Sequence, residues 1–155
     1  MPPIPTDNDP QRWHRYFAVE CNNRAWDLST ATRSASDDEE MLNAAHAAAM
    51  HWQAVGTELN HMRAKMLLAE VHAALGLGAS AFAYAAEVKP FFLDRDSPDW
   101  EIAFTHVIYA HAAHAAGKRD EHRHAYTEAQ AAIDAIAADA DREIVLKTFA
   151  HVPTP

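Results

Sequence analysis

Glycine and proline occur at only a few points of this chain, and long uninterrupted stretches lie between those points. Of the eight prolines, only Pro90 and Pro98 fall between residues 11 and 152. Each glycine follows a stretch of periodic apolar residues, where a left-handed cap is expected at the carboxyl end of a helix. The pattern therefore predicts a series of helices separated by turns at the four glycines, which are Gly56, Gly76, Gly78 and Gly117.

Signals for helix starts complete this division. Asp9-Pro10 and Ser97-Pro98 are typical of an N-cap followed by proline at the first helical position, and Ser36 with Glu39 forms a capping-box pattern. Pro90 is expected to end or kink its helix. Connections other than residues 90–97 are short, so neighbouring helices should be antiparallel. The signals predict seven helices at about residues 10–30, 37–55, 58–75, 79–89, 98–116, 119–138 and 141–150.

Composition agrees with a helical fold. Alanine supplies 34 of the 155 residues, whereas Val, Ile and Thr together supply 21, a balance that favours helix over sheet. In the third predicted helix Leu59, Met62 and Met66 share one face, and Leu68 and Val71 lie roughly opposite. A helix that is apolar on two sides packs between neighbours. We therefore predict one all-α domain over residues 1–155, built of three antiparallel helical hairpins and a C-terminal capping helix, with loose ends at 1–9 and 151–155.

Two windows can be aligned with the tetratricopeptide repeat, a 34-residue helical hairpin. In the first, Leu68-Ala69 take the Leu-Gly place, Gly76 the turn and Ala81 the small residue of the second helix, while His72 stands at the usual Tyr. In the second, Tyr109-Ala110, Gly117, Tyr126 and Ala129 take the corresponding places. Lys65 and His106 replace the consensus Trp, His122 replaces a small residue, and the loop at 90–97 lengthens the spacing. Residues 65–129 thus resemble a tetratricopeptide-like array.

Three longer segments resemble an uncharacterised family of small bacterial proteins. They are Arg15 to Trp26, His51 to Thr57, and Met66 to Gly76. This resemblance spans most of the chain and implies the helical fold, but it implies no activity.

Several functional classes are disfavoured by the sequence. Cys21 is the only cysteine, which excludes an intrachain disulfide and a cysteine-based metal cluster. The chain carries 13 Lys and Arg against 22 Asp and Glu, with no basic stripe, so nucleic acid is not expected as a partner. The start lacks the pattern of a secretory signal, and no apolar stretch has the length of a membrane span. These features predict a cytoplasmic protein that does not bind membranes.

Eleven histidines raise the question of a metal site. Glu58 with His61, and Glu121 with His124, fit the Glu-x-x-His pattern of di-iron bundles, but both pairs fall in the first turn of a helix. On the fifth helix His106, His111 and His114 lie near one stripe, which falls short of the ligand set and supporting contacts of a zinc site. No nucleophile motif or phosphate loop is present. We therefore expect no cofactor and no metal. A small-molecule or metal-dependent enzyme that uses this histidine-rich face is the alternative.

Charged residues within apolar stripes give the strongest indication of a site. Because an unpaired buried charge is costly, such residues either form salt bridges between helices or line a wet cleft. The first helices of stacked hairpins line the concave side of an array, so we predict that these residues face a common groove. The function expected is recognition of a peptide or partner protein without catalysis; a self-associating structural protein, such as a homodimer, is a further option. The predicted ligand-binding residues are Glu20, Arg24, Arg63, Glu70, His106 and His114.

Overall fold

The computed structural model describes all 155 residues and contains seven α-helices and no strands. The predicted all-helical fold is therefore confirmed, and most helices begin and end within three residues of their expected positions. The helices are α1 (Pro10–Ser29), α2 (Ala35–Val55), α3 (Glu58–Ala74), α4 (Gly78–Leu93), α5 (Asp99–Ala115), α6 (Arg119–Asp134) and α7 (Asp139–Phe149).

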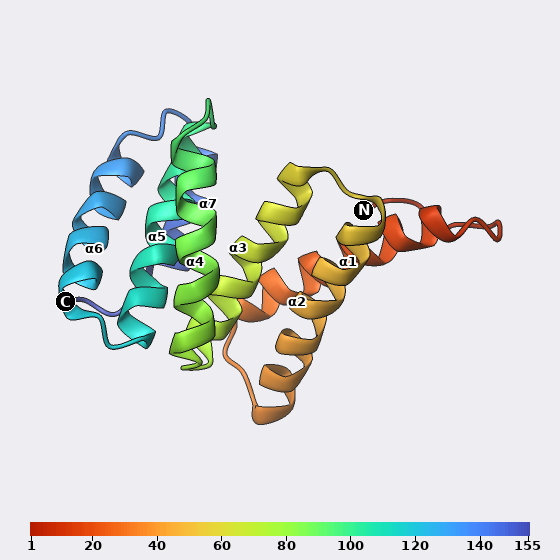
Figure 1. Cartoon of the computed structure of the whole chain (residues 1–155), viewed down its shortest axis with the longest axis horizontal. Coiled ribbons are helices and arrows are strands. Elements are labelled where there is room, and N and C mark those ends of the chain that lie inside the picture. The colour runs from red at the N-terminus through yellow and green to blue at the C-terminus, as the bar shows by residue number, and fades with distance from the viewer.

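Helices α1 to α6 follow one another across the molecule in sequence order, and α7 returns to lie beside α5 (Figure 1). Each helix from α1 to α6 packs against the next one in the chain, so α1 lies on α2, α3 on α4, and α5 on α6. Odd-numbered helices also contact one another: α3 packs on both α1 and α5, and α7 packs on α5. The four odd-numbered helices consequently form a continuous layer in which each contacts the next.

Two apolar clusters hold this arrangement together. The larger cluster runs from α3 to α7 and includes Phe92, Ile108 and Val145, none of which is more than 1% exposed. The smaller one joins α1, α2 and α3 through residues such as Met41 and Leu67, which are fully buried. Helix α3 contributes to both clusters, as its two apolar faces predicted. The α1–α2 pair is therefore attached to the remaining helices mainly through α3.

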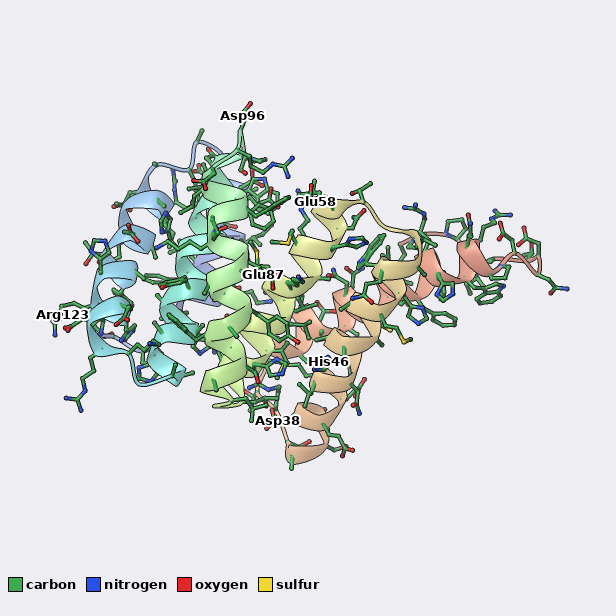
Figure 2. All side chains as sticks on the ribbon, in the orientation of Figure 1. Asp38, His46, Glu58, Glu87, Asp96 and Arg123 are labelled. Carbon is green, nitrogen blue, oxygen red and sulfur yellow. The ribbon has the colours of Figure 1, made fainter.

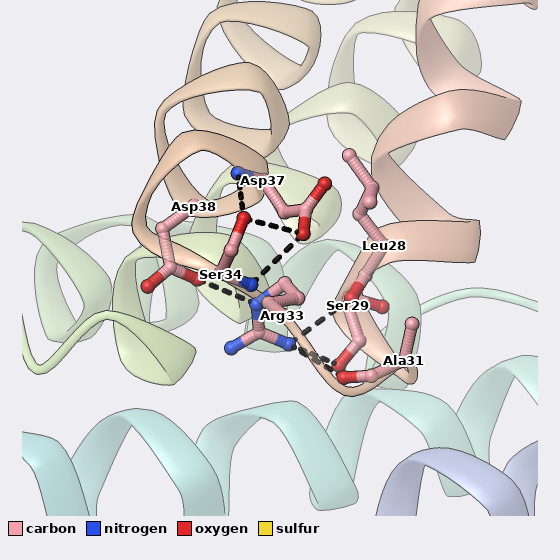
Figure 3. Close-up of polar contacts among 7 residues, drawn as sticks. All are labelled: Leu28, Ser29, Ala31, Arg33, Ser34, Asp37 and Asp38. Atoms are coloured by element: carbon pink, nitrogen blue, oxygen red, sulfur yellow. Dashed lines mark hydrogen bonds and ion pairs between the residues drawn. The ribbon is translucent and has the colours of Figure 1, made fainter.

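Arg33 organises the connection between α1 and α2 (Figure 3). Its guanidinium donates to the carbonyl oxygens of Leu28 and Ser29 at 3.0 and 3.1 Å and to Asp38 at 2.6 Å. A cation at this position stabilises the carboxyl end of α1, where carbonyl groups lack helical partners. The capping box of α2 consists of Ser34 with Asp37, so the predicted box beginning at Ser36 is wrong by two residues.

Two of the four glycines form the caps that the sequence predicted. Gly76 and Gly117 have φ of 71° and 70°, a conformation that favours glycine. At Gly76, the following N–H donates to the carbonyl of His72, which gives the paired bonds of a Schellman motif. The prediction is wrong at the other two positions. Gly56 has extended backbone, and Gly78 begins α4, where a Cβ would overlap the backbone of Ala115.

Helix α4 continues through Pro90 to Leu93, beyond the predicted end at 89. Pro90 removes only one hydrogen bond in the last turn, and that turn buries Phe92 completely. Ser97 does not act as the N-cap of α5; its hydroxyl donates to the carbonyl of Phe92 at 2.8 Å. Helix α6 ends at Asp134 rather than 138, because the chain turns there and buries Ile136.

Both ends of the chain contact the helices at particular residues. Near the start, the carbonyl of Asp7 accepts a bond of 2.9 Å from the indole of Trp13. Near the end, Val152 is buried in the larger cluster and the carbonyl of Pro153 lies 2.8 Å from Nε2 of His122. None of the seven helices combines the length and apolar character that a membrane crossing requires.

Candidate functional site

A cavity of about 390 Å³ lies against the layer of odd-numbered helices, and all four of them contribute to its walls. This volume is within the range of small-ligand sites. The lining residues are Asn22, Trp26 and Asp27 of α1 with Thr30 just after it, Arg63 and Met66 of α3, Trp100, Glu101 and Phe104 of α5, and Ile144, Lys147 and Thr148 of α7.

Three aromatic rings from two helices form one side of the cavity. The ring centroid of Phe104 lies 5.5 Å from that of Trp26 and 6.4 Å from that of Trp100, with interplanar angles of 74° and 87°. Phe104 is only 7% exposed, and the two tryptophans are half-buried. Both indoles thus stand roughly perpendicular to a buried phenyl ring. We call this group, Trp26, Trp100 and Phe104, the aromatic box.

A charge pair lies beside the aromatic box. Arg63 donates to both carboxylate oxygens of Glu101, at 2.6 and 3.2 Å, and its guanidinium carbon lies 5.7 Å from the ring centre of Trp100. The Glu101 side chain is 3% exposed, whereas that of Arg63 is 41% exposed. Two further charges, Asp27 and Lys147, line the cavity from exposed positions and form no ion pair.

Of the six residues predicted to face one groove, only Arg63 lines this cavity. Arg24 forms two bonds of 2.6 and 2.9 Å with Glu40 on α2, and this contact lowers the pKa of the Glu40 carboxyl. Glu70 lies 3.0 Å from Nδ1 of His111 on α5, and both side chains are buried. These two charges therefore join neighbouring helices, as salt bridges within apolar stripes do.

The remaining three predicted residues also lie apart from one another. His106 faces α6, with Nδ1 at 3.3 Å from a carboxylate oxygen of Glu128, and burial lowers its pKa. The exposed ring of His114 contacts that of His122 at 4.9 Å between centroids. Glu20 on α1 has one buried carboxylate oxygen without a hydrogen-bond partner. None of the six forms a hydrogen bond or an ion pair with another of the six.

The histidines of the chain make separate contacts. His46 on α2 packs its ring against that of His72 on α3, at 5.3 Å between centroids (Figure 2). His14 and His51 join α1 to α2, with their Nδ1 atoms 2.8 Å apart. No group of three or more His, Cys, Asp or Glu side chains is placed to hold a metal ion. On the histidine-rich face of α5, His111 contacts Glu70 and His106 contacts Glu128, so the histidines have separate partners.

The aromatic box and Lys147 were not among the residues that the sequence singled out. Glu101 lies in the first turn of α5, where a carboxylate is ordinarily a partner of the helix dipole. The site is recognised because residues from four helices lie close together in space. Helical periodicity describes the faces of single helices and cannot predict this proximity.

Comparison of the chain with known protein families, with curated proteins and with solved structures gave no match.

Proposed function

We propose that the chain is a tetratricopeptide-like array that binds a peptide segment of a partner protein in the cavity and has no catalysis of its own. The main support for this proposal is that α1, α3, α5 and α7 together line one cavity. In hairpin stacks, the first helix of each pair forms the concave binding surface. We infer that the first helices of the three pairs, and then α7, take those places in this chain.

The packing of small residues supports the same arrangement. Ala69, Ala81, Ala110 and Ala129 lie at positions where the repeat pattern uses small residues, and each is 0% exposed. Small side chains at helix contacts let two helices approach closely, which a hairpin stack requires at every pair.

The chemistry of the cavity suits a peptide better than a reaction. It combines large aromatic anchors with charges of both signs, which is the usual composition of recognition surfaces. Glu101 is engaged by Arg63 and therefore serves poorly as a free base. No nucleophile with an adjacent base lines the cavity.

A peptide library provides the test. A random library is selected on the wild-type protein alone, and the selected peptides are then measured against variants of the cavity wall; one of these is Lys147→Glu, which changes the exposed wall of α7. Selected peptides should bind the wild type and lose about tenfold in affinity with Lys147→Glu or Trp100→Ala, since aromatic anchors dominate such contacts. Arg123→Ala is the matched control, because Arg123 points outward from α6 (Figure 2).

Selected peptides that bind all three variants equally well would place recognition elsewhere on the molecule. Failure to select any peptide would contradict the proposed function. Circular dichroism of each variant establishes that the helical fold is retained.

A further inference from the structure

The aromatic box has the geometry of a site for an organic cation. Two indoles stand nearly perpendicular to the Phe104 ring, one at 74° and the other at 87°. Aromatic rings carry negative π faces, and rings set at right angles to one another can enclose a group that lies against those faces. Cations are attracted to such faces, most strongly to those of tryptophan.

The structure already places one cation on a wall of the box. The Arg63 guanidinium lies over Trp100 at 5.7 Å from its ring centre, while its nitrogens bond Glu101. Arg63 therefore lines the cavity with its charge already paired to a buried carboxylate. Trp26 on α1 has no cation over its ring, although Asp27 beside it in sequence lines the cavity without an ion pair.

Hydration decides which cation suits the box. A primary ammonium is strongly hydrated and needs hydrogen-bond acceptors when it leaves water. The three rings supply none, both oxygens of Glu101 already accept from Arg63, and the other carboxylate of the cavity, Asp27, is exposed to water. An ammonium whose hydrogens are replaced by methyl groups loses little hydration and gains contact with three rings. The formal net charge of −9 also favours a cationic ligand over an anionic one.

We propose that the aromatic box binds a quaternary ammonium group, carried either by a small molecule or by a methylated lysine of the bound peptide. The cation lies between Trp26 and Trp100 against Phe104, and Asp27 adds an unpaired negative charge. A methylated lysine as the source rests on the proposed peptide-binding function, whereas a small molecule does not.

Four tryptophans make the test specific. In a heteronuclear NMR spectrum, titration with tetramethylammonium or choline should shift the indole N–H signals of Trp26 and Trp100. Trp13 and Trp52 lie outside the cavity lining and should stay unchanged as internal controls. The N-methyl protons of the ligand should move upfield, because they would lie against aromatic faces. The uncharged isostere 3,3-dimethylbutan-1-ol should bind at least about fivefold more weakly, which is the range of a partly desolvated cation–π contact.

Variants of the two exposed charged residues test whether the bound group is a cation. Asp27→Asn should weaken choline binding by about threefold, while Lys147→Gln should tighten it, because Lys147 carries the same charge as the ligand; both effects are small since both side chains are exposed. Equal binding of choline and the neutral isostere, or shifts spread over all four indoles, would overturn the proposal. So would the absence of any shift.

A peptide pair separates this proposal from the proposed function. A selected peptide is prepared with trimethyllysine at one position and with norleucine at the same position. Preference for trimethyllysine supports both ideas, and tight binding of both peptides without choline binding overturns only the cation site. Binding of choline without selection of any peptide assigns the site to a small molecule and overturns the peptide function.

Discussion

Two ion pairs join α3 to α5, and they differ in how far water reaches them. In the first, Glu70 and His111 have side chains that are 1% and 7% exposed. In the second, Glu101 is 3% exposed but Arg63 is 41% exposed, at the wall of the cavity. Both pairs connect the same two helices. A charge in an apolar stripe therefore does not by itself mark a binding site, and the exposed partner distinguishes the pair that borders one.

The largest expected effect is at the fully buried pair. Glu70→Ala leaves His111 without its carboxylate in a buried position, so we expect the free energy of unfolding to fall by about 3–5 kcal/mol. Urea denaturation followed by circular dichroism measures the change. The control is Glu87→Ala, which removes a carboxylate paired with Lys65 that is 53% exposed, and it should cost about 0–1 kcal/mol. Similar losses in the two variants would contradict the distinction between the pairs.

Removal of one partner should destabilise the protein less at the pair that borders the cavity. Arg63→Ala lets water reach Glu101, so we expect a loss of about 1–3 kcal/mol in the free energy of unfolding, the range for a hydrogen bond to a charged group. The double variant with Glu101→Ala should recover part of that loss, because the buried carboxylate is then absent as well. Arg24→Ala is the matched control, since it removes an arginine whose pair with Glu40 is exposed on both sides. If Arg63→Ala lowered the free energy of unfolding by as much as Glu70→Ala does, the two pairs would be equivalent.

The smallest effect concerns pH. Burial alone would lower the pKa of His111, but the charge of Glu70 and its hydrogen bond outweigh burial and raise it. The folded state therefore binds this proton more tightly than the unfolded chain, whose histidines titrate near about 6.5. The stabilisation is fully present below that pH and is lost as the pH rises through the folded pKa.

The measurement compares the wild type with Glu70→Gln. The difference between their unfolding free energies should shrink as the pH is raised from about 6 to 8, the range in which histidine changes its charge. An NMR titration of the His111 ring should show a lower pKa in the variant. A difference in stability that does not change over this range would mean that His111 is neutral in the folded protein.

Much of the fold could be predicted from the sequence, because helix boundaries depend on local chemistry. Gly76, Gly117 and the Asp9-Pro10 start are short signals that do not depend on the remaining chain. Predictions went wrong where packing decided the boundary. Helix α4 passes Pro90 because Phe92 is buried in the next turn, and α6 ends early because Ile136 is buried after it.

The site could be predicted only in part, for a different physical reason. Periodicity identifies a face of a helix but not the neighbour that will cover it. Glu70 and His106 lie in or beside apolar stripes, as expected, but those stripes face other helices, so their charges are paired in the interior. Arg63 lies near the end of such a contact and remains accessible. Trp26 and Lys147 are separated by most of the chain, and only the stacking of α1, α3, α5 and α7 places both at one cavity.

The walls of the cavity come from opposite ends of the polypeptide, and this affects when the site exists during synthesis. Residues of α1 emerge from the ribosome first and those of α7 among the last, so a nascent chain has no closed cavity until nearly all of it has been made. Translation that stops before residue 139 yields helices that lack the Ile144, Lys147 and Thr148 wall. The cavity thus forms together with the finished fold, and truncated products lack the wall that α7 supplies.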